Sequence, residues 1–264
     1  MAAETQPVLL KRDAQSGIAV ITFNRPAVFN ALDVATASAF EEVVAEIQRE
    51  PNLRCVVITG TGRAFMAGGD VGAFAADLDN ADRTLNLILN HMHPALLALR
   101  QLDAPIIAAV NGTAAGAGLS LVLSADLVVA HPAAKFVLAY DKLGVPPDCG
   151  GSWYLARKVG RAKAFELMLL GQALDAAAAQ AAGIVNIVAG DETFWPEVEA
   201  CAARVAEGPT RAFGQFKRLM DVEQPLAAHL EMERHGFVAA TRTEDFRGAA
   251  TAFVAKRAPQ YQGR

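Results

Sequence analysis

Apolar positions along the chain occur in two patterns, short unbroken runs and longer stretches with helical spacing. The unbroken runs are bounded by glycine, proline or polar residues, which is typical of buried strands. They predict strands over residues 18–23, 55–58, 106–110, 127–130 and 184–188. The stretches with helical spacing predict helices over residues 34–49, 83–102, 117–124 and 161–170. This alternation of strands and helices predicts an α/β fold.

The last quarter of the chain has a different pattern. From Trp195 to Val254 the apolar positions fall at helical spacing, interrupted at Gly208-Pro209 and at Gln224-Pro225. We therefore predict an all-helical C-terminal region. No linker-like segment separates it from the rest, and no short internal repeat is visible.

One apolar run, residues 106–110, leads through Asn-Gly-Thr-Ala-Ala-Gly directly into an apolar helical segment. The first turn of a helix has N–H groups without helical partners and is the positive end of the helix dipole, so it stabilises negative charge. Gly112, Gly116 and Gly118 would let a ligand approach the main chain closely. The alternative is a tight turn that serves packing alone. The glycine spacing fits neither a P-loop nor a dinucleotide fold.

A second glycine-rich turn follows the apolar run 55–58 and reads Thr-Gly-Thr-Gly-Arg-Ala-Phe-Met-Ala-Gly-Gly-Asp-Val over residues 59–71. Two such turns can direct two main-chain N–H groups at one oxygen atom. Paired donors of this kind stabilise an oxyanion. The two turns together therefore favour a catalytic site over a packing device.

Four segments in order along the chain resemble motifs of the crotonase (enoyl-CoA hydratase/isomerase) superfamily: Phe-Asn-Arg-Pro-Ala-Val-Phe-Asn-Ala-Leu at 23–32, and the segments 65–70, 107–118 and 246–257. The resemblance covers nearly the whole chain. It implies a crotonase-like spiral of ββα units over residues 1–194 and a helical C-terminal trimerisation region over residues 195–264. It also implies a homotrimer or a dimer of trimers.

The resemblance implies a site for acyl-coenzyme A thioesters, in which the amides of Gly69 and Ala117 hold the thioester oxygen as it becomes an oxyanion. Coenzyme A is then part of the substrate, and no permanently bound cofactor is expected. The residues that the resemblance assigns to coenzyme A binding are Ala27, Phe29, Ala67, Gly68, Gly69, Asp70, Val71, Ala117 and Tyr140. Residues 74–99 are expected to shape the acyl pocket.

The acid and base residues differ from those of the hydratases in the superfamily, which use two glutamates for the addition of water. This chain has Ser120 and Tyr140 at those two positions, so hydration by that route is not expected. Asp148 lies a few residues further on, in a Pro-Pro-Asp-Cys-Gly-Gly turn that resembles the 1,2-epoxyphenylacetyl-CoA isomerase group. As a structural alternative, Asp148 caps the helix that follows. Cys149 is expected to serve packing.

A single carboxylate suffices for an isomerase, because it can remove a proton from one carbon of an unsaturated thioester and return it to another. The sequence thus favours an acyl-CoA isomerase with Asp148 as the catalytic acid and base. Three alternatives stay open: an enoyl-CoA hydratase that uses another base, a dehalogenase in which Asp148 is a nucleophile, and a non-catalytic acyl-CoA-binding homologue.

Composition limits the other classes of protein. The chain has 264 residues, 53% of them hydrophobic, with a net charge of −4, which argues against general nucleic-acid binding. Residues 1–13 lack the apolar core of a secretory signal and no apolar run is long enough to span a bilayer, so we expect a cytoplasmic protein with no membrane partner. The three cysteines have no metal-like spacing, so neither a disulfide framework nor a metal site is expected.

Overall fold

The computed structural model describes residues 6–264, apart from the side chain of Phe74. The strands are β1 (Val8–Asp13), β2 (Ile18–Phe23), β3 (Cys55–Gly60), β4 (Ala64–Met66), β5 (Ile106–Val110), β6 (Thr113–Ala115), β7 (Leu127–Ala130), β8 (Lys135–Val137), β9 (Leu174–Asp175) and β10 (Ile187–Val188). The α-helices are α1 (Val34–Ile47), α2 (Val71–Ala75), α3 (Ala81–Gln101), α4 (Ala117–Ser124), α5 (Gly151–Leu170), α6 (Ala176–Ala181), α7 (Phe194–Ala206), α8 (Thr210–Asp221), α9 (Leu226–Ala240) and α10 (Glu244–Val254). Three 3₁₀ helices are η1 (Pro26–Val28), η2 (Leu78–Asn80) and η3 (Tyr140–Leu143).

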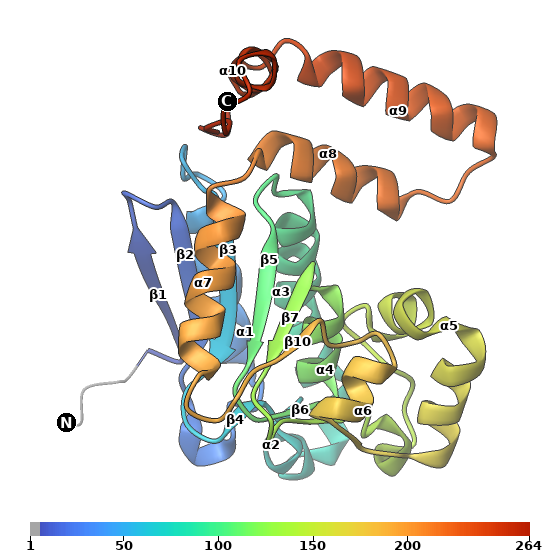
Figure 1. The fold of residues 1–264 in the computed structure, drawn as a ribbon. Coiled ribbons are helices and arrows are strands. Elements are labelled where there is room, and N and C mark those ends of the chain that lie inside the picture. Colours follow the sequence, from blue (N-terminus) through green and yellow to red (C-terminus); the bar gives the residue numbers. More distant parts are fainter. Residues whose placement is uncertain (1–5) are drawn as a thin grey trace.

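Two sheets form the body of the molecule (Figure 1). The larger has the order β1-β2-β3-β5-β7-β10 and is parallel except for the β1–β2 pair. The smaller has the order β4-β6-β8-β9 and is parallel except for the β8–β9 pair. The chain passes three times from a strand of the larger sheet to one of the smaller sheet and then into a helix. This repeated ββα unit is the predicted spiral.

Side chains on both faces of the larger sheet are buried, which explains why its central strands are unbroken apolar runs. Val56 and Ile58 pack with α1 and α3 in one cluster. Cys55 and Val57, which alternate with them along β3, pack with α7 in a second cluster. Helix α7 therefore belongs to the packed body, whereas the division of the chain at residue 194 stays a prediction.

Most of the elements predicted for the larger sheet are confirmed. The strands at 18–23, 106–110 and 127–130 and the helix at 117–124 have the predicted bounds, and the strand at 55–58 extends to Gly60. The terminal region is helical with breaks at both predicted places, and the chain turns once more between α9 and α10.

One predicted strand was too long, and one predicted helix has a partner that was missed. The strand predicted at 184–188 is limited to β10, because the N–H groups of Ile184 and Val185 both donate to the carbonyl of Ala179 at the end of α6. The helix predicted at 161–170 is confirmed as the second half of α5, because Gly160, with φ of 77° and ψ of 159°, is non-helical and separates it from a first half that begins at Gly151 and was not predicted. Gly160 therefore ends one helical segment and the next begins directly after it.

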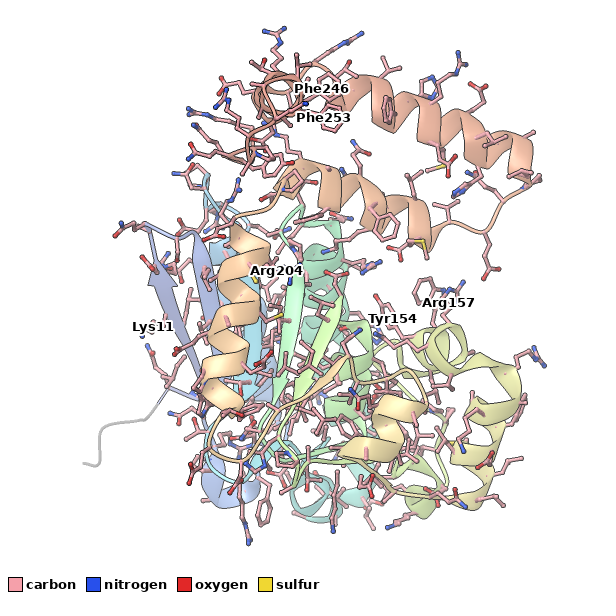
Figure 2. The ribbon with its side chains drawn as sticks, in the orientation of Figure 1. Lys11, Tyr154, Arg157, Arg204, Phe246 and Phe253 are labelled. Atoms are coloured by element: carbon pink, nitrogen blue, oxygen red, sulfur yellow. The ribbon has the colours of Figure 1, made fainter. Side chains whose placement is uncertain are left out.

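Helices α8 to α10 lie at the end of the molecule opposite the smaller sheet (Figure 1). Among the described residues, α9 has no buried side chain, and large apolar side chains of α9 and α10 are exposed, including Phe237 at 71% and Phe253 at 83%. Phe246 and Phe253 lie on α10, remote from the sheets (Figure 2). Within residues 6–264 every helix is too short or too polar to cross a bilayer.

Candidate active site

The two glycine-rich turns meet in the structure. Strand β4 lies within the first turn and pairs with β6, which lies within the second, so that Met66 is opposite Ala114. A Cβ atom added to Gly68 would lie 3.0 Å from the carbonyl oxygen of Ala115 and 3.5 Å from Cα of Gly116. Both glycines have positive φ, 95° and 53°. The close main-chain approach and the left-handed backbone together explain why these positions carry glycine.

The two predicted oxyanion donors lie beside this contact. Gly69 follows Gly68, and Ala117 is the first residue of α4, with Gly116 before it. Leu32 bridges the first turn: its N–H donates to the carbonyl of Gly68 at 2.7 Å, and its carbonyl accepts from the N–H of Asp70 at 2.8 Å. Across residues 6–264 no hydrogen bond is recorded for the N–H of Gly69 or Ala117. Two main-chain donors are thus available where the turns meet.

The N-terminal motif holds the first turn in place. Asn30 is 1% exposed, and its Nδ2 donates to the carbonyls of Thr61, Ala64 and Phe65 at 2.9–3.2 Å. Arg25 forms ion pairs with Asp33 and Asp70, of 3.0 and 3.4 Å. These structural roles were not predicted from the sequence. The Asn-Arg-Pro and Asn-Ala-Leu pattern was the available signal.

We expect Asn30→Ala to destabilise the protein, because the buried carbonyls of Ala64 and Phe65 and the half-buried carbonyl of Thr61 lose a donor. The expected loss is about 1–3 kcal/mol in the free energy of unfolding, measured by urea denaturation. Asn24→Ala is the control, since Nδ2 of Asn24 donates to the exposed carbonyl of Gln6. Equal unfolding midpoints for the two variants would show that the amide of Asn30 does not hold the turn.

Asp148 lies in a hydrogen-bonded chain with the two residues at the hydratase positions. The hydroxyl of Tyr140 donates to Oδ1 of Asp148 at 2.6 Å, and Oγ of Ser120 lies 3.0 Å from that hydroxyl. Ser120 is in α4 and its N–H donates to the carbonyl of Gly116, so the chain connects Asp148 to the helix that begins with Ala117. The structure therefore brings the predicted acid and one predicted oxyanion donor into the same region.

The capping alternative for Asp148 is contradicted. Helix α5 is preceded by Gly150 and has no side-chain cap, and the carbonyl of Asp148 accepts from the N–H of Gly151 at 2.8 Å. The carboxylate is half-buried and is directed to Tyr140 instead.

Burial controls the titration of the neighbours of Asp148. Burial raises the pKa of Tyr140, and the charge of Asp148 and the hydrogen bond to it raise it further. Burial also raises the pKa of the Cys149 thiol, again with a contribution from Asp148. Tyr140 is therefore a neutral hydrogen-bond donor, and Cys149 is an uncharged buried side chain, as packing requires.

A mainly apolar cavity of about 440 Å³ adjoins the turn that carries Asp148. Its walls are formed by the end of α3, the start of α5 and Asp221 of α8, namely His93, Leu96, Leu97, Arg100, Cys149, Gly150, Trp153, Tyr154 and Asp221. Tyr154 and Arg157 lie at the start of α5, on its side toward α8 (Figure 2). His93, Leu96 and Leu97 fall within the predicted range 74–99, whereas Arg100 and the contributions of α5 and α8 were not predicted.

The predicted coenzyme A residues lie in several environments. Ala27, Phe29 and Val71 are exposed, and the Arg63 guanidinium stacks 4.5 Å from the centre of the Phe29 ring. Ala67, Gly69 and Asp70 are half-buried, and Gly68 and Ala117 are buried. Tyr140 is 6% exposed and is engaged with Ser120 and Asp148. Their contacts with coenzyme A stay a prediction. In the described part of the chain, no group of three or more metal-ligating side chains is found.

Comparison with known proteins identifies the family. The family model "Enoyl-CoA hydratase/isomerase" matches residues 13–264. The 1,2-epoxyphenylacetyl-CoA isomerase of Escherichia coli is 37% identical over 95% of this chain and 97% of its own. A probable enoyl-CoA hydratase of Rhodobacter capsulatus is 37% identical over 97% of this chain and 98% of its own.

A solved structure of an enoyl-CoA hydratase/isomerase from Mycobacterium abscessus superposes with a TM-score of 0.90 at 32% identity, over 97% of this chain and 100% of that one. The fold is thus shared over its full length, including the C-terminal helices. The chain belongs to the enoyl-CoA hydratase/isomerase family, with the crotonase fold.

Proposed function

We propose that the protein is an isomerase of unsaturated acyl-CoA thioesters. The observation that supports this most directly is the presence of a carboxylate, Asp148, joined through Tyr140 and Ser120 to the helix that carries one oxyanion donor. In this proposal the N–H groups of Gly69 and Ala117 bind the thioester oxygen and stabilise the negative charge that develops on it. Asp148 removes a proton from one carbon and returns it to another.

Each step uses a group that the site provides. Removal of a proton from the unsaturated acyl chain gives a dienolate, whose charge is on the thioester oxygen between the two amides. Asp148 then holds the proton, and delivery to a different carbon of the dienolate moves the double bond. Because one group takes and returns the proton, no second acid is needed.

The family includes proteins named as hydratases as well as isomerases, so hydration is the second candidate. Hydratases of the superfamily use two glutamates, and this chain has a buried Ser120 and a buried Tyr140 at those positions. A hydratase would have to activate water with another base. The chemistry of these two side chains favours isomerisation.

Deuterium exchange and a substrate panel test the proposal. Wild-type protein is incubated in D₂O with 3-enoyl-CoA thioesters, both linear and ring-bearing, and with crotonyl-CoA. We expect movement of the double bond with deuterium incorporation and little hydration of crotonyl-CoA. Rapid hydration would favour the hydratase, and tight binding of coenzyme A with no turnover would favour a non-catalytic homologue.

The acyl pocket of this proposal is the cavity lined by Cys149 and Gly150, the two residues that follow Asp148. Its apolar walls suit an acyl chain, and Trp153, whose ring has the Arg157 guanidinium stacked 3.6 Å from its centre, adds aromatic surface. One relative is named for an aromatic acyl thioester, which supports including ring-bearing substrates. The exposed residues Ala27, Phe29 and Val71 are proposed to contact the coenzyme A part, which binds as substrate and not as a resident cofactor.

We also propose that the chain assembles as a homotrimer or a dimer of trimers through its C-terminal helices. The exposed apolar side chains of α9 and α10 support association, because burying them against another copy would remove apolar surface from water. Sedimentation equilibrium should give a mass three or six times that of one chain, and a monomer would contradict the proposal. A cytoplasmic location is proposed with it, testable by cell fractionation.

A further inference from the structure

The direction of the hydrogen bonds around Asp148 follows from their chemistry. A carboxylate only accepts, so the Tyr140 proton is donated to Oδ1 across 2.6 Å. With that proton committed, Ser120 has two acceptors for its one hydroxyl proton, the phenol oxygen at 3.0 Å and the carbonyl of Gly116 at 3.4 Å, and the shorter contact favours donation to Tyr140. The three side chains thus form one directed chain, from Ser120 through Tyr140 to Asp148.

The three hydrogen-bonded side chains come from different elements, which fixes their relative positions. Ser120 is 1% exposed in α4, Tyr140 is 6% exposed in η3, and Asp148 precedes α5. Gly151 lies so close to Ser120 that an added Cβ would be 2.3 Å from its Oγ. The start of α5 and the start of α4 are therefore fixed against each other at this point.

We propose that Tyr140, supported by Ser120, is a positioning residue that fixes the carboxylate of Asp148 through Oδ1 and leaves Oδ2 to face the substrate. The inference rests on the proposed role of Asp148 as the acid and base. It assigns a purpose to the two positions where the hydratases have glutamates: here they support a carboxylate that enters from the α5 turn. In this role Tyr140 does not touch the substrate.

The hydrogen bond holds one oxygen of the carboxylate in place. Because burial raises the pKa of Tyr140, its hydroxyl stays protonated and donates across the working pH range. Tyr140 and Cys149 are titratable side chains that face Asp148, and the Cys149 thiol is likewise kept neutral by burial. Neither neighbour therefore adds a charge that would offset the loss of the hydroxyl.

Kinetics of Tyr140→Phe test the inference, because this change keeps the ring and removes only the hydroxyl. We expect kcat for isomerisation to fall by about 10–100-fold, as for the loss of a hydrogen bond to a charged group, while KM stays within about twofold because binding is untouched. The acid limb of the pH profile should move to higher pH. Ser120→Ala should lower kcat and move the acid limb to higher pH, each by a smaller amount. Tyr261→Phe, the same change in the C-terminal tail, is the control.

A second measurement separates failure of the inference from failure of the proposed function. The Asp148 carboxyl carbon is observed by NMR in protein labelled with ¹³C-aspartate and is assigned by its absence in Asp148→Asn. Its titration midpoint should be higher in Tyr140→Phe than in the wild type, whether or not a thioester is turned over. An unchanged midpoint and an unchanged kcat would overturn the inference. If the wild type had no isomerase activity but the midpoint was still higher in Tyr140→Phe, the proposed function alone would be overturned.

Discussion

Replacing Asp148 by asparagine should abolish most of the isomerase activity. The amide has nearly the same shape and can still accept from Tyr140, so the fold and the hydrogen-bonded chain are kept. It cannot take up the substrate proton. Removal of a general acid and base lowers kcat by about 10²–10⁴-fold, and deuterium incorporation from D₂O should fall in proportion.

The matched control is Asp141→Asn, the same substitution at an exposed position of η3, which should keep wild-type activity. Thermal unfolding of both variants checks that the fold is intact. Full activity of Asp148→Asn with exchange at the wild-type rate would exclude this carboxylate as the proton carrier. A lower kcat with an unchanged KM would place the loss in the chemical step.

Gly118→Ala is expected to damage both stability and catalysis, because the second residue of α4 packs directly on β4. An added Cβ would lie 2.3 Å from the carbonyl oxygen of Met66 and 2.8 Å from its Cβ, so one of the two turns has to move. Overpacking of this kind costs about 1–3 kcal/mol. Displacing one oxyanion donor, Gly69 or Ala117, should lower kcat by about 10²–10³-fold.

Gly248→Ala in α10 is the control, since its nearest atom to an added Cβ is 4.0 Å away. This variant should keep its activity and its unfolding midpoint. Denaturant unfolding and kcat are measured together for both variants. If Gly118→Ala were as active as the wild type, the close approach of α4 and β4 would not set the geometry of the oxyanion donors.

The short strands were not predicted, because three residues are too few to show a hydrophobic pattern. Strands β4, β6 and β8 have three residues each, and the sequence presents the first two as parts of glycine-rich turns. Their pairing depends on partners far along the chain, as in Met66 with Ala114. Strand β1 was missed because it is mostly exposed, with Lys11 and Arg12 in its second half. Edge strands of this kind lack an apolar run.

The candidate site was predictable only where its residues lie in local motifs. Gly69, Ala117 and Asp148 each lie in a local motif, which made them visible in the sequence. The partnership of Asp148 with Tyr140 joins residues on separate elements, and the cavity walls come from α3, α5 and α8. Neither has a periodic signal within one segment.

The sequence by itself determined the central strands of the larger sheet, the helical C-terminal region and, through four motifs, the resemblance to the family. These are local properties, because periodicity, glycine positions and short motifs are written in neighbouring residues. Only the tertiary structure decided that the two glycine-rich turns touch, that Asn30 and Leu32 hold one of them, and that Asp148 accepts from Tyr140 instead of capping α5. Those features depend on packing between distant elements, whose geometry no single segment specifies.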